Sequence, residues 1–319
     1  MIPNCLNLRR AISGYRNPNS SGRPEPYTSF NQMGTLNNPL QLVSDGDEMD
    51  LDDEWALLRR LLIDNTSQWF LDRLDEPYPP LGAWVADNAQ IAQTWEDQSK
   101  SLKRSVHLLQ PERLLMTIHE HESAHICDTE NNLVTFVWRH FCPDQSYIDS
   151  VLKSTAEARS TLLLVGDATG IDFSSSPDPG LASAMVTFWD LCRIWLPVEI
   201  ISDIQSRCAY TNHPSNKQRP PSGCVSKNHS SAIVRGSQSP TWKVSWILNQ
   251  TFNSHHGGSF YLSDYGLRVE AASNTLIAWK SSNAHGFGLF DLDQCRKGLL
   301  QSGLTIGSLK GLLANFQAS

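Results

Sequence analysis

The chain has 319 residues, of which 40% are hydrophobic and 18% are charged, and its formal net charge is −7. This composition is that of an ordinary globular protein with one large core or two modest ones. The negative charge argues against broad, sequence-independent binding to nucleic-acid phosphates, although it does not exclude nucleic acid bound in a local basic groove.

The N-terminal sequence lacks the apolar core of a secretory signal, and no run of eighteen apolar residues predicts a transmembrane helix. Four arginines precede the first acidic residue, Glu25, so an organellar transit segment is the alternative to a plain tail. The seven cysteines have irregular spacing and form no CxxC motif, which indicates reduced thiols. We therefore expect an intracellular protein, nuclear or cytoplasmic, with no membrane partner.

The first half of the chain is predicted to contain a tail and a helical region. Residues 1–45 are rich in Asn, Ser, Pro and Gly and are expected to be disordered. Residues 46–158 are expected to be mainly helical with one hairpin. Apolar residues at helical spacing predict helices over 53–74 and 87–109, and an alternating pattern around a D-T-E-N-N turn predicts the hairpin over 125–141.

The second half, 159–319, is expected to form a second domain rich in β-structure. A helix over 146–158 leads into it, and 160–166 has the composition of a buried strand. A long apolar stretch over 178–207 predicts a helix split at its internal proline, and 211–241 is a polar, Pro/Ser-rich loop. Four short β-type segments then follow, over 242–248, 258–262, 266–271 and 274–280. The fold class is therefore α+β, with helices first and an antiparallel β domain after them.

Two constellations have the composition of zinc sites. His121-Glu122-Ser123-Ala124-His125 is a literal H-E-x-x-H, which on a helix would place two imidazoles on one face with the glutamate as general base. Because the motif leads directly into a predicted strand, a polar connector is the preferred interpretation and a zinc protease the alternative.

The second constellation lies in and beside the polar loop, where Cys208 and His213 are followed by Cys224 and His229. Two Cys/His pairs can close a structural zinc site, but the usual spacing pairs Cys with Cys and His with His. Ordinary loop residues are the preferred interpretation.

The stretch "GGSFYLSDYGLRVEAASNTLIAWKSSNAHG", residues 257–286, resembles the distal half of fungal 2-oxoglutarate/Fe(II) dioxygenases. More loosely, it resembles the branch related to the methylcytosine dioxygenases and base-J-binding proteins. The matching positions are Gly257-Gly258, Gly266-Leu267-Arg268, Asn274-Thr275 and the late His285. The resemblance covers residues 228–310.

This resemblance implies a double-stranded β-helix, or jelly roll, that binds Fe(II) and 2-oxoglutarate and oxidises a C–H bond of an unknown small-molecule, protein or nucleobase substrate. It implies His285 as the late iron ligand, His229 as the second ligand and Arg296, eleven residues after His285, as the anchor of the 2-oxoglutarate carboxylate. The adjacent His255 and His256 are interpreted as turn residues.

The family's early His-x-Asp is where this chain departs from the pattern. One alignment places it on His229-Ser230-Ser231 and the other on Val234-Arg235-Gly236, and neither offers a carboxylate. No Asp or Glu occurs between Asp203 and Asp264. The sequence therefore leaves two alternatives, a dioxygenase with an incomplete metal triad and a catalytically inactive jelly-roll protein that binds or scaffolds.

Overall fold

The computed structural model describes residues 66–96, 105–157, 167–171, 179–208, 223–236, 242–251, 254–298 and 300–306. The predicted tail, most of the first predicted helix, the predicted strand over 160–166 and most of the polar loop lie outside these residues.

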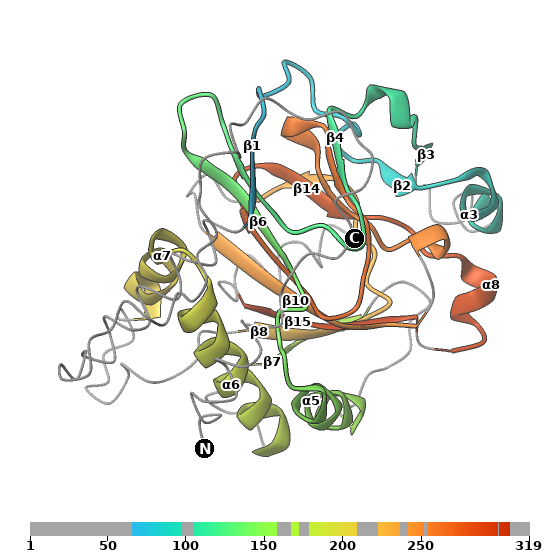
Figure 1. Ribbon diagram of the computed structural model, residues 1–319. Helices are drawn as coiled ribbons and strands as arrows, with labels where there is room; N and C mark the ends of the chain where they lie inside the picture. Colours follow the sequence, from blue (N-terminus) through green and yellow to red (C-terminus); the bar gives the residue numbers. More distant parts are fainter. Residues whose placement is uncertain are drawn as a thin grey trace, which may run out of the picture. The chain divides into compact units, whose positions relative to one another are not determined.

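A large sheet and a small sheet form a sandwich, with helices beside them (Figure 1). The large sheet has the strand order β1-β5-β6-β13-β10-β15-β8-β7 and the small sheet β4-β12-β11-β14-β9, while β2 and β3 pair separately. The strands are β1 Ser67–Phe70, β2 Trp84–Ala86, β3 Val106–Leu108, β4 Met116–Ile118, β5 Ala124–Cys127, β6 Leu133–Arg139, β7 Asp167–Ile171, β8 Gly223–Lys227, β9 Val234–Arg235, β10 Trp242–Gln250, β11 Phe260–Leu262, β12 Leu267–Val269, β13 Thr275–Lys280, β14 Ala284–Phe287 and β15 Gln301–Ile306. The helices are α3 Ala89–Thr94, α5 Gln145–Glu157, α6 Pro179–Trp195, α7 Val198–Cys208 and α8 Leu292–Cys295, with short 3-10 turns η3 Pro111–Arg113, η5 Ser254–His256 and η6 Ser263–Tyr265.

From β8 onward the chain passes repeatedly between the two sheets. The strands β8, β10, β13 and β15 belong to the large sheet, and β9, β11, β12 and β14 belong to the small one. Within each sheet these strands pair antiparallel. Such winding is consistent with the expected jelly roll, in which two four-stranded sheets face each other.

The outer face of the large sheet is covered by helices. Trp246 on β10 is fully buried, and its ring lies 5.3 Å from that of Phe141 and 5.5 Å from that of Phe188 on α6. Tyr147 on α5 stacks on the same tryptophan. The Asp203 carboxylate on α7 accepts a hydrogen bond from the first backbone amide of β10. These contacts bury the outward face of β10. Its other face is directed toward the small sheet, so β10 is buried on both sides.

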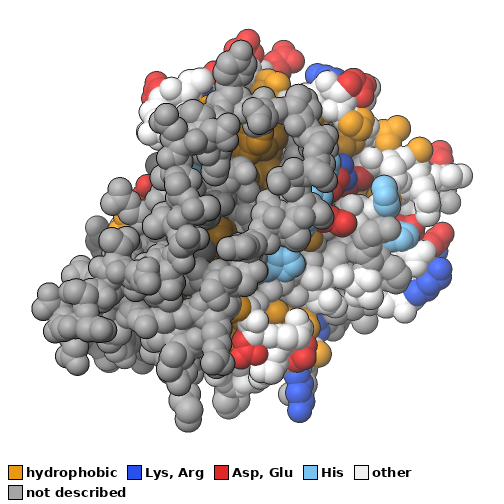
Figure 2. Space-filling model, in the orientation of Figure 1, with side chains coloured by type: hydrophobic (Ala, Val, Ile, Leu, Met, Phe, Trp, Pro, Cys, Tyr) orange, Lys and Arg blue, Asp and Glu red, His pale blue; other side chains and the backbone are white. Residues whose placement is uncertain are grey.

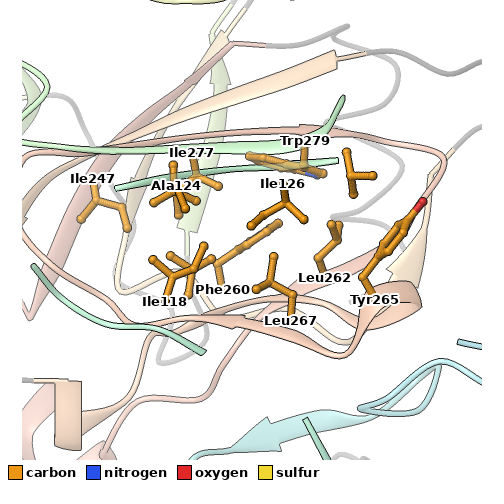
Figure 3. Packing of buried hydrophobic residues seen from close by; sticks show 13 residues of the cluster. Ile118, Ala124, Ile126, Ile247, Phe260, Leu262, Tyr265, Leu267, Ile277 and Trp279 are labelled. Atoms are coloured by element: carbon orange, nitrogen blue, oxygen red, sulfur yellow. The ribbon is translucent and has the colours of Figure 1, made fainter. Parts of the chain in front are cut away.

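An apolar core fills one part of the interior between the sheets (Figure 3). Side chains of β12 and β4 in the small sheet meet those of β5, β6 and β13 in the large sheet. The fully buried members include Ile118, Ile126, Phe260, Leu267 and Ile277. Burying each such side chain contributes about 1.5–3 kcal/mol, so this cluster is a principal source of attraction between the sheets.

The outer face of the small sheet carries a buried polar network. Tyr261 on β11 and Arg268 on β12 are directly opposite each other and both contact the carboxylate of Asp87. Ser259 donates to the same carboxylate at 2.6 Å. Arg268 is thus a cross-strand partner, as its alternation with apolar neighbours in the sequence indicates, and it neutralises a buried aspartate.

Several predicted elements are confirmed. The hairpin is the antiparallel pair β5 and β6, and the helix over 146–158 is α5. The split helix is α6 and α7, interrupted around Pro197 as expected, and the four late β segments correspond to β10, β11, β12 and β13.

The described part of 46–158 contains more strand than the sequence predicts, whereas the domain boundaries themselves stay a prediction. Where a helix was expected over 53–74, residues 67–70 form β1, which pairs in parallel with β5. Where one was expected over 87–109, α3 has six residues, and Val106–Leu108 pairs with β2. In both places sheet pairing overrides a helical pattern, because tertiary contacts outweigh intrinsic propensity.

Cys127, Cys142, Cys192, Cys224 and Cys295 have free thiols, which agrees with the expectation of reduced cysteines. None of the described helices has both the length and the apolar character needed to span a bilayer. Where the visible face is described, Figure 2 shows acidic and basic side chains beside one another along its rim.

The Asn274 side chain links the start of β13 to the segment after β6 and to Trp246 on β10 through hydrogen bonds. Its φ is 52°, its amide exchanges two hydrogen bonds with the backbone of Cys142, and its Oδ1 also accepts from the Trp246 indole. We predict that Asn274→Ala lowers the free energy of unfolding by about 3 kcal/mol, because it adds left-handed strain to the loss of these bonds. Urea denaturation measures the change.

Asn131→Ala is the matched control, because Asn131 also has a positive φ, 63°, but lies exposed in the β5–β6 turn. Only the strain of about 1 kcal/mol is expected there. Equal losses in the two variants would contradict a stabilising role for the Asn274 amide.

Candidate ligand-binding site

His285 on β14 is directed into the interior of the sandwich. It is 3% exposed and lies opposite Leu262 on β11 and Val234 on β9. Its Nδ1 lies 2.7 Å from the backbone oxygen of Asn283, so Nδ1 carries the proton and donates it to that carbonyl. The buried Nε2 is then an acceptor, and no described residue donates a hydrogen bond to it.

His229 lies beside the same strand, in the connection from β8 to β9. Its ring packs edge-on against Phe287, with centroids 5.5 Å apart. Phe287 and His285 are two residues apart on β14 and therefore share one face of it. The structure thus brings both predicted histidines to the interior side of the small sheet.

Lys243 on β10 lies across the sandwich from the two histidines. It is 2% exposed and directly opposite Trp279 on β13, whose ring lies 5.5 Å from that of His285. Among the described residues, Lys243 forms no hydrogen bond or ion pair. Burying a charge costs free energy unless the charge is paired, so Lys243 is unfavourable at this position unless a group pairs with it.

Burial lowers the pKa of all three groups, and the charge of Lys243 lowers the pKa of the two histidines further. Burial, and then the nearby Lys243 charge, lower the pKa of His285 to about 3 and that of His229 to about 4. Burial lowers the pKa of Lys243 to about 8, and Cys224 acts weakly in the opposite direction. At neutral pH both imidazoles are therefore uncharged, and Lys243 is mainly protonated.

Polar side chains of the large sheet surround Lys243. Ser245 follows on the same face of β10, opposite Thr305 on β15, and their hydroxyls are 3.0 Å apart. Thr305 in turn lies opposite Cys224 on β8. The sandwich interior is thus divided into the apolar core around β12, β13 and β4 and a polar part around β8, β10 and β15. We call Lys243, Ser245, Thr305, Cys224 and His285 the interior polar cluster.

The residues present do not fit the three-ligand iron centre that the resemblance implies. Val234 stands opposite His285, where the first residue of His-x-Asp would lie in the second alignment. Arg235 forms an ion pair with the buried Asp264, 2.5 Å away, which itself also contacts Arg73. No group of three His, Cys, Asp or Glu side chains able to hold a metal occurs among the residues that the structure describes.

Gly236, at the third position of that alignment, has no room for a side chain. Its amide donates to the Ser281 carbonyl at 2.8 Å, and a Cβ built on it would lie 2.5 Å from the same oxygen. The next five residues, 237–241, contain no His, Asp or Glu. A carboxylate ligand therefore has no place at this end of β9.

Arg296 is not brought to the histidines. It is the C-terminal cap of α8, its side chain is 59% exposed, and it pairs with Asp293 at 3.3 Å. In Figure 1, α8 lies at the edge of the molecule. The residue that the structure does bring to the interior, Lys243, was missed in the sequence, where the lysine in "WKVSWIL" has the place of a solvent-facing strand residue.

The structure places the residues of two other histidine motifs away from any helix that could carry a zinc site. His121 lies in a turn and His125 on β5, so the H-E-x-x-H is not on a helix and the zinc-protease alternative is wrong. His255 and His256 form η5, a turn as expected. The Cys/His loop cannot be assessed, because His213 lies outside the described residues.

No protein-family model matches this sequence, and no curated protein matches it. Among solved structures, the chain is similar to NgTET1 in complex with 5mC DNA, with a TM-score of 0.43 and 12% identity, covering 71% of this chain and 92% of that one. It is similar to a 2OG-Fe(II) oxygenase family oxidoreductase from Burkholderia pseudomallei, with a TM-score of 0.36 and 12% identity, covering 56% and 85%. It is also similar to HygX from Streptomyces hygroscopicus with nickel and 2-oxoglutarate bound, with a TM-score of 0.33 and 11% identity, covering 55% and 82%.

The lowered pKa of Lys243 predicts a pH-dependent stability. Because its folded pKa is about 8 and its usual value 10.5, the unfolded chain binds more protons between these values. The contribution of Lys243 to the free energy of unfolding should therefore rise by up to about 3 kcal/mol as pH increases from 8 to 10.5. Lys243→Met should lose this rise and be more stable at pH 7.

Urea denaturation at several pH values compares this variant with Lys153→Met, a change at an exposed position of α5. The control should retain the pH dependence of the unaltered protein. Parallel pH profiles for the unaltered protein and Lys243→Met would show that Lys243 is not perturbed by burial.

The crowding at Gly236 predicts that Gly236→Ala lowers the free energy of unfolding by about 2 kcal/mol, because the backbone must move away from Ser281. Gly298→Ala is the matched control, since no atom lies within 4 Å of its added methyl group. Thermal denaturation of both variants measures the difference. A Gly236→Ala protein as stable as the control would mean that β9 can accommodate a side chain there.

Proposed function

We propose that this chain is a catalytically inactive jelly-roll protein that binds a ligand between its two sheets. It has the architecture of 2-oxoglutarate/Fe(II) oxygenases without their metal triad. The observation that carries this proposal is the end of β9, where Val234 is opposite His285 and Gly236 has no space for a side chain. In the alignment that places His-x-Asp on Val234-Arg235-Gly236, both ligand positions are thus occupied by residues without a metal-binding side chain.

The chemistry of a non-haem iron centre supports this proposal. Two histidines and one carboxylate occupy one face of the iron and leave the opposite positions for co-substrate and oxygen. When bound, iron and 2-oxoglutarate supply the oxidising power, and the protein supplies geometry. Here the buried carboxylate of Asp264, in the turn η6 between β11 and β12, is held by Arg235 and Arg73. It is thereby committed to a structural role.

The interior polar cluster supports binding as the retained function. A sandwich kept only for stability would be expected to have an apolar interior throughout. Instead, one part of this interior has a buried ammonium group on Lys243 and an unpartnered imidazole nitrogen on His285. Groups of this kind, placed among apolar walls, are what orient a small ligand in a binding site.

A second candidate function is a dioxygenase in which His285 and His229 are the only protein ligands of the iron. The buried Nε2 of His285 favours it, because Nδ1 bonded to a backbone carbonyl is the arrangement that orients metal-ligating histidines. In this candidate a small molecule, a protein or a nucleobase is oxidised at a C–H bond, and the 2-oxoglutarate anchor is a residue other than the exposed Arg296.

Anaerobic calorimetry with Fe(II), with and without 2-oxoglutarate, separates the two candidates. We expect no stoichiometric Fe(II) binding and no difference between the unaltered protein and His285→Ala. Succinate release from 2-oxoglutarate in air should equal that of a protein-free control. One equivalent of bound Fe(II) that is lost in His285→Ala and His229→Ala, together with succinate release, would overturn the proposal in favour of the dioxygenase.

A further inference from the structure

The ammonium group of Lys243 is the first half of a recognition site. The Lys243 side chain extends from the interior face of β10, the residue as a whole is 2% exposed, and its ammonium group forms no hydrogen bond or ion pair among the described residues. Lysines are rarely buried this completely unless they are paired. The positive charge therefore needs an anion that the described part of the chain does not supply.

Neither of two candidate anions among the described residues serves as this partner. Burial raises the pKa of the Cys224 thiol to about 12, so the thiol is neutral at physiological pH. The carboxylate of Asp264, in the turn η6, is engaged by Arg73, Arg235 and the Ala284 amide. The described part of the chain thus leaves the Lys243 charge open to an anionic group of a bound molecule.

His285 provides the second half of the site. Its Nδ1–H is committed to the Asn283 carbonyl, so Nε2 offers only a lone pair. The two halves are adjacent, because Trp279 lies directly opposite Lys243 in the sheet and its ring contacts the His285 ring at 5.5 Å. A molecule that satisfied both would need an anionic group and, close to it, a hydrogen-bond donor.

We infer that Lys243 and His285 together bind a small hydroxycarboxylate anion. The carboxylate pairs with the Lys243 ammonium, and the hydroxyl donates its proton to Nε2 of His285. This inference rests on the proposed function, because it assigns a metal-free ligand to the same interior.

The charge of the site favours a carboxylate over a phosphate. Lys243 is the only cation of the interior polar cluster, which has no arginine fork for bidentate contacts. One ammonium group balances one negative charge, whereas a phosphate dianion needs more donors. The neighbouring hydroxyls of Ser245 and Thr305 bond to each other and add polarity without charge.

Calorimetry on the full chain in the presence of EDTA tests the inference with two pairs of monoanionic probes, lactate against propionate and glycolate against acetate. Within each pair the molecules differ by one hydroxyl. We expect the hydroxylated member to bind about tenfold more tightly, because its partner leaves Nε2 unsatisfied. Inorganic phosphate should bind more weakly than either hydroxylated probe.

Two variants separate the halves of the site. Lys243→Met should weaken all four carboxylates by about tenfold or more, since the buried charge partner is lost. His285→Phe keeps a ring against Trp279 and should abolish only the preference for the hydroxyl. Lys280→Met is the control, because this lysine lies over the Trp242 ring outside the cluster, and it should change nothing.

Binding to the unaltered protein tests the inference even if a variant fails to fold. Lactate should raise its thermal midpoint, because a ligand that binds only the folded state stabilises it. Absence of lactate and glycolate binding in a protein that also fails to bind Fe(II) would overturn this inference and leave the proposed function intact. Binding of these anions only after Fe(II) is added would overturn both, and a preference for phosphate would overturn the assigned ligand class.

Discussion

Both faces of β10 are buried, and the rest of the sandwich depends on this constraint. Its outward residues pack under the helices, with Trp246 between Phe141 and Phe188. Its inward residues meet the small sheet. A strand covered on both sides has no solvent face, so any polar residue on it must be satisfied inside the protein. Lys243 and Ser245 are such residues, and they determine where the interior is polar.

The small sheet also has buried residues on both of its faces. Its inward side is apolar where it meets β6 and β13 and carries histidines where it meets β10. Its outward side buries Asp87 with Tyr261 and Arg268, and Asp264 with Arg235. Among the described residues, the carboxylates of Asp87 and Asp264 thus lie on the outer side of the small sheet, paired with arginines, and the Lys243 ammonium group lies inside the sandwich. This separation is the basis for proposing an anionic ligand in place of a three-ligand metal centre.

Much of the fold was predictable from local pattern. The α5 helix, the break around Pro197 and the strands β10 to β13 follow from periodicity and from breakers. The strands β1 and β3 were not predictable, because their residues have helical spacing and become strands only through pairing with β5 and β2. Likewise, "WKVSWIL" indicates a strand, but only the position of the small sheet shows that Lys243 lies in the interior.

The sequence by itself determined the late histidine, His285, and the absence of any carboxylate between Asp203 and Asp264. These depend on residue identity and order alone. Only the tertiary structure decided which side chains meet. In the folded chain Val234 lies opposite His285, and Gly236 has no room for a side chain. Arg296 is exposed, and Lys243 lies opposite Trp279. The reason is physical: strand register and the covering of sheet faces are fixed by contacts between distant segments, which no local pattern contains.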